Sequence, residues 1–145
     1  MIGCLLDVNV LIALLWPQHE AHVRAQRWFA KNADQGWATC AMTQAGFVRI
    51  LSNPAFSRRV VTPRDALEVL QGSLLHRAHQ FWTEDVGVVE LLAQFGRRLT
   101  EHQQITDAYL LALAIHKKGR LATLDPSLGS LLPDDNDAKK RMVLL

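Results

Sequence analysis

Short segments that are apolar on both faces alternate along this chain with longer segments of helical periodicity. The first pattern is typical of strands buried in a parallel sheet, and apolar positions three and four residues apart are typical of helices with one buried face. The predicted strands are Ile2–Leu6, Trp37–Met42, Gln80–Trp82, Arg120–Leu124 and, at a sheet edge, Met142–Leu145. The predicted helices are Val10–Leu15, Glu20–Lys31, Gln44–Ser52, one that starts at Thr62-Pro63, Val86–Phe95 and Thr106–Lys118. This alternation predicts an open, mostly parallel α/β sheet with helices on both faces.

Residues with a preference for helix ends support several of these boundaries. Thr43 is placed to cap the helix that starts at Gln44, and Thr62 precedes a proline, which suits the first position of a helix. Gly119 follows a predicted helix at a position where glycine is common. The polar residues 134–140 predict an exposed tail.

Length and composition indicate one globular domain over residues 1–145. Apolar residues make up 49% of the chain and charged residues 21%. The longest apolar run, Ala108–Ile115, is shorter than the roughly 20 residues that cross a bilayer. Asp7 lies in the first apolar segment and no basic residue precedes Arg24, which does not match a secretory signal. We therefore expect a cytoplasmic protein without a membrane segment.

Neither the cysteines nor the net charge selects a function. Cys4 and Cys40 lie in apolar segments without the spacing of a zinc site, which favours buried side chains in a reducing compartment. The formal net charge of +2 neither indicates nor excludes a nucleic-acid partner. Glycine-rich nucleotide-binding motifs are absent from the sequence, and the two histidines of His19-Glu20-Ala21-His22 are one residue too close for a metalloprotease helix.

Three aspartates are expected at one edge of the predicted sheet. Asp7 and Asp125 directly follow apolar strands, and Asp107 opens a helix whose N-terminus faces the same edge. Carboxylates gathered there repel one another, and Mg²⁺ or Mn²⁺ relieves the repulsion because these ions prefer oxygen ligands. Asn9 adds a second oxygen ligand near Asp7. Each aspartate has an alternative interpretation, in which it only caps the following helix.

These residues belong to segments that resemble PIN-domain ribonucleases, and specifically the VapC-type toxins of bacterial toxin–antitoxin pairs. The segments are LLDVNVLIAL at 5–14, TQAGFVRILSNP at 43–54, FW-x-x-D at 81–85 and TDAYLLALAIHKKGRLATLD at 106–125. The resemblance implies a compact α/β fold, dependence on Mg²⁺ or Mn²⁺ and hydrolysis of RNA phosphodiester bonds. It also implies a homodimer and a small antitoxin that covers the acidic cleft.

The resemblance places Asp7, Asp107 and Asp125 on the acidic positions of the family. The fourth acid, commonly a glutamate after the second strand, is replaced here by Gln44, which can ligate a metal or orient a water but brings no charge. Either three carboxylates suffice, or another acid completes the site. The candidates for that acid are Glu20, Glu84 and, as the preferred one, Asp85.

The implied chemistry assigns roles to the residues around the acids. Asp7 and Asp107 are the expected direct metal ligands, and Asp125 either ligates the metal or holds a metal-bound water. Thr123 and Asn9 are candidates for fixing these carboxylates.

Basic residues are candidates for gripping the RNA backbone, although each is equally compatible with a solvated surface. Arg49 lies on the helix after the second strand, where it would hold a phosphate through two hydrogen bonds, and His102 precedes Asp107 by five residues. The remaining candidates are Arg58, Arg59, Arg97 and Arg98. The apolar helices around Trp16 and Trp28 are a candidate surface for a partner's helix.

Two other functional classes remain as alternatives. In the first, the fold is a non-catalytic module that binds RNA or a protein, inactivated by Gln44. In the second, Asp7 is a phosphate acceptor in an Asp/Mg phosphoryl-transfer protein. Residue types disfavour the second, because a dehalogenase-like phosphatase requires an aspartate where Asn9 stands, and a receiver domain requires a lysine where Leu124-Asp125 ends its strand.

Overall fold

The computed structural model describes residues 3–58 and 60–145, and it contains a five-stranded sheet in the order β3-β2-β1-β4-β5. The strands are β1 (Cys4–Leu6), β2 (Trp37–Thr39), β3 (His79–Phe81), β4 (Arg120–Thr123) and β5 (Met142–Leu144). All the strand pairings in this part of the chain are parallel. The predicted α/β architecture is confirmed, with β5 at an edge, whereas Ile2, expected to start the first strand, lies outside the described residues.

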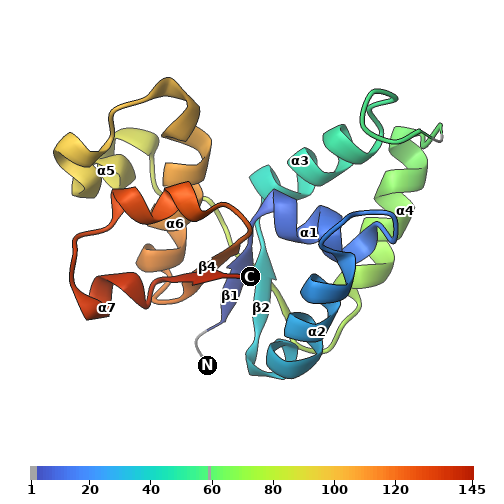
Figure 1. Cartoon of the computed structure of the whole chain (residues 1–145), viewed down its shortest axis with the longest axis horizontal. Helices are drawn as coiled ribbons and strands as arrows, with labels where there is room; N and C mark the ends of the chain where they lie inside the picture. The colour runs from blue at the N-terminus through green and yellow to red at the C-terminus, as the bar shows by residue number, and fades with distance from the viewer. Residues whose placement is uncertain (1–2, 59) are drawn as a thin grey trace.

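Helices cover both faces of this sheet (Figure 1). One face carries α1 (Val8–Leu15), α2 (His22–Asn32), α3 (Ala41–Leu51) and α4 (Pro63–Leu74), and the other carries α5 (Val88–Leu92) and α6 (Ile105–His116). The helix α7 (Asn136–Lys139) precedes β5, and short 3₁₀ helices lie at Ala33–Gln35 (η1), Ala93–Arg98 (η2), His102–Gln104 (η3) and Pro126–Leu131 (η4). Within the described ranges, none of the helices has the length and apolar content needed to cross a membrane.

The central strands are apolar on both sides because each faces two layers of helices. In β1, Leu5 packs into the cluster of α5 and α6, whereas Cys4 and Leu6 pack into the cluster of α1 to α4. In β4, Leu121 and Ala122 divide between the two clusters in the same way. Since successive side chains of a strand point to opposite faces, a strand between two helical layers is expected to be apolar on both faces. The buried hydroxyls of Thr39 and Thr123, at the ends of β2 and β4, are the polar exceptions.

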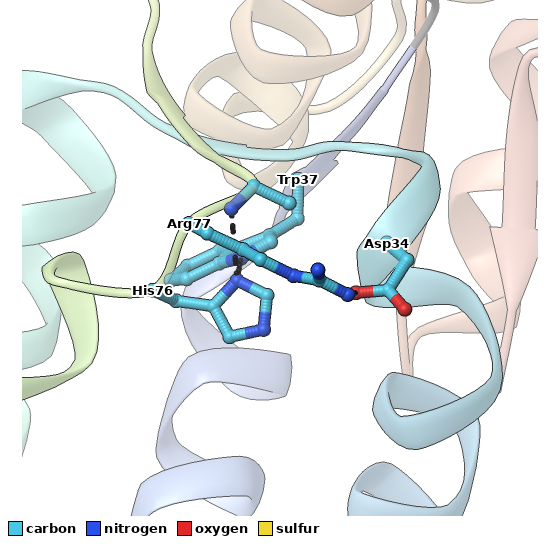
Figure 2. A network of polar contacts seen from close by, with 5 residues as sticks. Asp34, Trp37, His76 and Arg77 are labelled. Atoms are coloured by element: carbon cyan, nitrogen blue, oxygen red, sulfur yellow. Dashed lines mark hydrogen bonds and ion pairs between the residues drawn. The ribbon is translucent and has the colours of Figure 1, made fainter.

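The edge strand β3 is held by contacts of the turn that precedes it (Figure 2). The indole Nε1–H of Trp37 and the backbone N–H of Ala78 both donate to His76 Nδ1, at 3.2 and 3.1 Å. This nitrogen must therefore lack a proton, and the neutral ring carries its proton on Nε2. An exposed ion pair of Arg77 with Asp34, at 2.8 Å, links the same turn to η1.

Several predicted boundaries are wrong by a few residues, for identifiable reasons. Thr43 does not cap α3 from outside but lies in its first turn, where its hydroxyl exchanges hydrogen bonds with the backbone of Cys40. The helix predicted at Val86–Phe95 is α5 followed by η2, which contains Gly96 with a positive φ of 51°. The exposed residues 134–140 include α7, because the Asp135 side chain accepts a hydrogen bond from Ala138 N.

The end of α6 uses a different residue from the one the sequence indicates. Lys118, with φ of 60°, takes the left-handed conformation that was expected of Gly119. The N–H of Gly119 donates to the carbonyl of Ala114 and that of Lys118 to Ile115, which is the Schellman arrangement. Gly119 is needed for space instead, because a Cβ there would lie 2.6 Å from the carbonyl oxygen of Gly3 and 2.5 Å from the Trp82 ring.

We expect Gly119→Ala to lower the free energy of unfolding by about 2 kcal/mol, since the backbone of Gly3 has to move to admit the methyl group. Gly72→Ala in α4 is the matched control, because a Cβ there meets nothing within 4 Å. The control should gain about 0.5–1 kcal/mol from the lower entropy of its unfolded chain. Denaturant unfolding of both variants checks this, and equal stability of Gly119→Ala and the parent protein would contradict the close approach.

Candidate active site

Asp7 is buried at the carboxyl end of β1, where it caps α1. Its Oδ1 accepts a hydrogen bond from Val8 N at 2.7 Å, and its Oδ2 accepts one from the Thr123 hydroxyl at 2.8 Å. The side chain is 4% exposed. Burial raises the pKa of this carboxyl against the two hydrogen bonds, which lower it, and the negative charge of Asp125 raises it further.

Thr123 and Asn9, the two residues predicted to fix the carboxylates, join the ends of β1 and β4 through side-chain hydrogen bonds. The Thr123 hydroxyl donates to Asp7 and accepts from Asn9 Nδ2 at 3.3 Å and from Asp125 N at 3.1 Å. Asn9 Oδ1 in turn accepts from Leu124 N at 3.1 Å. Each polar group of this network holds another in place, so Asp7 has little rotational freedom.

Asp107 and Asp125 complete an acidic rim, a term we use for Asp7, Asp107 and Asp125 together. Asp125 follows β4 and caps η4 through a hydrogen bond from Ser127 N at 2.9 Å. Asp107 lies in the first turn of α6, and its pKa is raised to about 6. The main cause is burial, followed by the negative charges of Asp7 and Asp125, which places all three carboxyls within electrostatic reach.

The donor chemistry of the acidic rim fits a hard divalent cation. The three side chains offer only carboxylate oxygens, and the charges that raise the pKa of Asp107 are both negative, so a cation would relieve their repulsion. In the described part of the chain, no group of three histidine, cysteine, aspartate or glutamate side chains is arranged to hold a metal ion as it stands. Asp107 and Asp125 are only partly buried, whereas Asp7 is buried and held by two hydrogen bonds.

Gln44 lies in the second turn of α3, beside the same edge of the sheet. A Cβ on Gly46 would be 2.8 Å from Val8 Cγ2, so α3 packs directly against the start of α1 next to Asp7. The amide nitrogen of Gln44 donates to the hydroxyl of Thr39, the last residue of β2, at 2.9 Å. Thr39 is fully buried and also contacts His79 Nε2 at 2.8 Å.

The three acids considered as a fourth carboxylate differ in their contacts and exposure. Asp85 pairs with Lys117 at 3.3 Å, and this cation helps to lower the pKa of Asp85. Lys117 follows the last residue of α6, whereas Asp107 lies in its first turn, and Asp85 as the fourth carboxylate stays a prediction. Glu84 accepts a hydrogen bond from Met42 N at the start of α3, at 2.8 Å, and Glu20 is exposed.

The basic candidates are at the surface. Arg49 is exposed on α3 and lines the groove between α3 and α4 together with Gln44. His102 is exposed at the start of η3, just before α6. The exposed Arg58 lines a pocket with Trp16 and His19. Of the others, Arg97 and Arg98 are exposed in η2, and Arg59 lies outside the described residues.

Sequence reasoning missed the roles of Thr39, His79 and Glu84. Forty residues separate Thr39 from His79, and their contact depends on the parallel pairing of β2 with β3. The contact of Glu84 with α3 likewise depends on the path of the chain after β3. No local spacing signals either contact, so only the tertiary structure reveals them.

Comparison with known proteins identifies the family. The model of the PIN domain matches residues 4–131, which include the acidic rim. The chain belongs to the PIN-domain family. Ribonuclease VapC39 of Mycobacterium tuberculosis is 44% identical over 124 residues, which cover 86% of this chain and 89% of that protein. Ribonuclease VapC44 of the same species is 42% identical over 124 residues, covering 86% and 87%, and ribonuclease VapC38 is 40% identical over 127 residues, covering 88% of both chains.

Membership of this PIN-domain family agrees with the resemblance seen in the sequence and with the observed sheet. The matched segment runs from β1 through η4, so it contains all the elements that carry Asp7, Gln44, Asp107 and Asp125. The alignments with the relatives named ribonuclease VapC cover 86–88% of this chain and 87–89% of those proteins.

The raised pKa of Asp107 predicts that this residue destabilises the metal-free fold at neutral pH. Because the folded carboxyl holds its proton up to about pH 6 and the unfolded one only to about pH 4, stability falls as pH rises through this interval. Asp107→Asn removes this loss. Water screens the partly exposed carboxyl, so we expect the variant to be more stable by about 1 kcal/mol at pH 7.5 in EDTA and unchanged at pH 3.5.

Denaturant unfolding across this pH range, with Asp137→Asn as the control, measures the difference. Asp137 is almost fully exposed in a surface ion pair with Lys140, so its neutralisation should leave the pH dependence in place. A parallel pH dependence in Asp107→Asn and the parent protein would contradict the electrostatic coupling of the acidic rim.

Proposed function

We propose that this protein is a metal-dependent endoribonuclease toxin of a VapBC-type toxin–antitoxin system, acting in the cytoplasm. The observation that carries the proposal is the acidic rim, in which Asp7 and Asp125 help to raise the pKa of Asp107 to about 6. Burial and like charge oppose the ionisation of Asp107, and a bound cation would relieve the repulsion, which favours a role in binding a cation. The names of the relatives, ribonuclease VapC, support RNA as the substrate.

The residues of the acidic rim would hold Mg²⁺ or Mn²⁺, with Asp7 and Asp107 as direct ligands and Asp125 as a ligand or as the holder of a water. When bound, such an ion polarises the scissile phosphate and makes water a stronger nucleophile. Thr123 and Asn9 keep the Asp7 carboxylate in one orientation, which lowers the entropy lost when a cation or phosphate binds. Asp107 is less buried than Asp7, and a cation beside it would favour its ionised form and so lower its raised pKa.

The partners proposed here are RNA, a VapB-type antitoxin and a second copy of the chain. Arg49 and His102, both exposed, are available to bind phosphates of the RNA. The antitoxin follows from the toxin assignment, because a free ribonuclease of broad action would harm its own cell. The homodimer is proposed from the family resemblance.

The decisive experiment is cleavage of a total RNA or tRNA pool by purified protein shown to be free of antitoxin. We expect cleavage with Mg²⁺ or Mn²⁺ and none with EDTA. Asp7→Asn and Asp107→Ala should each lower the rate by about 100-fold or more, since direct ligands matter at least as much as the groups that support them. Asp137→Asn, a surface variant, should cleave like the parent protein. Cleavage by Asp7→Asn at the parental rate would contradict the assignment.

A non-catalytic module that binds RNA or a protein is the second candidate, favoured by one observation. Gln44 brings an amide where the resemblance puts an acid, while Asp85 is paired with Lys117, Glu84 accepts from Met42 N and Glu20 is exposed. In this case the folded parent protein binds RNA without cleaving it in any divalent cation. Metal-dependent cleavage that appears only in Gln44→Glu would establish this candidate and exclude the first.

A further inference from the structure

A chain of hydrogen bonds runs from the edge strand β3 to the helix α3. His79 Nε2 lies 2.8 Å from the Thr39 hydroxyl oxygen, and the amide nitrogen of Gln44 donates to the same oxygen at 2.9 Å. Thr39 is fully buried, so water does not compete for its hydroxyl. The Trp37 ring packs against His79 at a tilt of 57°, with ring centroids 4.7 Å apart, and limits the rotation of the imidazole.

The donors and acceptors of His79, Thr39 and Gln44 indicate the direction of the hydrogen bonds that join them. A hydroxyl has one proton, and the hydroxyl oxygen of Thr39 already accepts from the Gln44 amide. A buried hydroxyl proton without a partner is costly, and in the described part of the chain His79 Nε2 is the other polar atom that the Thr39 hydroxyl contacts. Donation of this proton to an unprotonated Nε2 is therefore the arrangement that satisfies the hydroxyl. The neutral ring then carries its proton on Nδ1. Burial lowers the pKa of His79, and so does the neighbouring His76, which agrees with a neutral ring.

The direction of these hydrogen bonds determines which atom of the Gln44 amide is left without a hydrogen-bond partner. Because the NH₂ group is engaged by Thr39, the carbonyl oxygen Oε1 points away from it. Among residues 3–58 and 60–145, no hydrogen-bond donor lies on this oxygen. Ala38 pairs with Leu5 in the parallel ladder, so Thr39 lies beside Leu6, the residue before Asp7. The Gln44 amide, bonded to Thr39, therefore lies near the sheet edge that holds the acidic rim.

We propose that His79 is a positioning residue for the candidate active site, acting through Thr39 to keep the carbonyl oxygen of Gln44, and not its NH₂ group, available to the acidic rim. The role of that oxygen toward a cation or water rests on the function proposed above, whereas the hydrogen-bond order itself does not. If the His79 acceptor is lost, the Thr39 hydroxyl becomes free to donate to Gln44, and the amide turns over.

The same proton count couples the residue at position 44 to the tautomer of His79. A glutamate carboxylate at position 44 has no donor, so Thr39 would have to donate its proton to it. The hydroxyl oxygen would then be left to accept from His79, which would have to carry its proton on Nε2. Gln44→Glu therefore exchanges the donor and acceptor roles in both side-chain hydrogen bonds of Thr39.

Nitrogen-15 NMR of the histidine ring tests this order without reference to activity. We expect the parent protein, at about pH 8 where histidine is ordinarily neutral, to show His79 with an acceptor-type Nε2 and a protonated Nδ1. Gln44→Glu should exchange the two signals. The control Gln71→Glu makes the same charge change on an exposed residue of α4 and should leave the His79 signals unchanged.

An unchanged His79 tautomer in Gln44→Glu would overturn the proposal, as would a protonated Nε2 in the parent protein. Thr39→Val checks the route, because removal of the hydroxyl should abolish the effect of Gln44→Glu on the His79 signals. A response that persists without the hydroxyl would mean that the charge acts directly and that Thr39 carries no coupling.

RNA cleavage then tests the consequence for the acidic rim. We expect His79→Phe, which keeps a ring against Trp37 but has no acceptor, to lower the cleavage rate about 10-fold, as is usual for residues that orient a metal site from outside it. Full activity in a folded His79→Phe protein would overturn the positioning role. A parent protein that cleaves no RNA overturns the proposed function instead, and it leaves the NMR result to decide the hydrogen-bond order.

Discussion

The hydrogen bond from the Thr123 hydroxyl to the Asp7 carboxylate joins the two central strands at the edge where the acidic rim forms. Its donor and acceptor are both buried, so loss of either partner leaves an unsatisfied polar group in the interior. The same hydroxyl accepts from Asn9 and from the backbone of Asp125. Three of the residues considered for the site thus depend on a single side chain for their orientation.

The three carboxylates of the acidic rim differ in their burial and in the hydrogen bonds that hold them. Asp7 is held by two hydrogen bonds and by burial, whereas Asp107 and Asp125 are partly exposed. Burial and like charge oppose ionisation of Asp107, so the metal-free rim is under electrostatic strain at neutral pH. A site of this kind gains binding energy from a cation both by direct contact and by removing the repulsion.

Gln44 occupies the position where the resemblance to PIN-domain ribonucleases puts an acid. Its amide does not contribute a charge, but the bond to Thr39 gives it a defined orientation. Thr39 reaches His79 on the edge strand, and the turn before that strand is anchored by His76 on Trp37 (Figure 2). The edge of the sheet farthest from β4 is therefore connected to the site through side chains that are buried or partly buried.

Sequence alone determined the order of the elements and the residues of the acidic rim. Strands that are apolar on both faces, such as those of β1 and β4, identify a parallel sheet between helical layers. Because the carboxyl ends of parallel strands share one edge, the positions of Asp7 and Asp125 directly after these strands predict their proximity without any coordinates.

Only the tertiary structure determined which side chains from distant segments contact one another around the acidic rim. Asp107 belongs to the first turn of α6, whereas Asp85 pairs with Lys117, the residue that follows the last turn of that helix. The link between His79 and Gln44 exists because β2 and β3 are neighbours in register. Local patterns report which way a residue faces within its own element. Contacts between distant segments depend on how whole elements pack, and no spacing in the sequence encodes that.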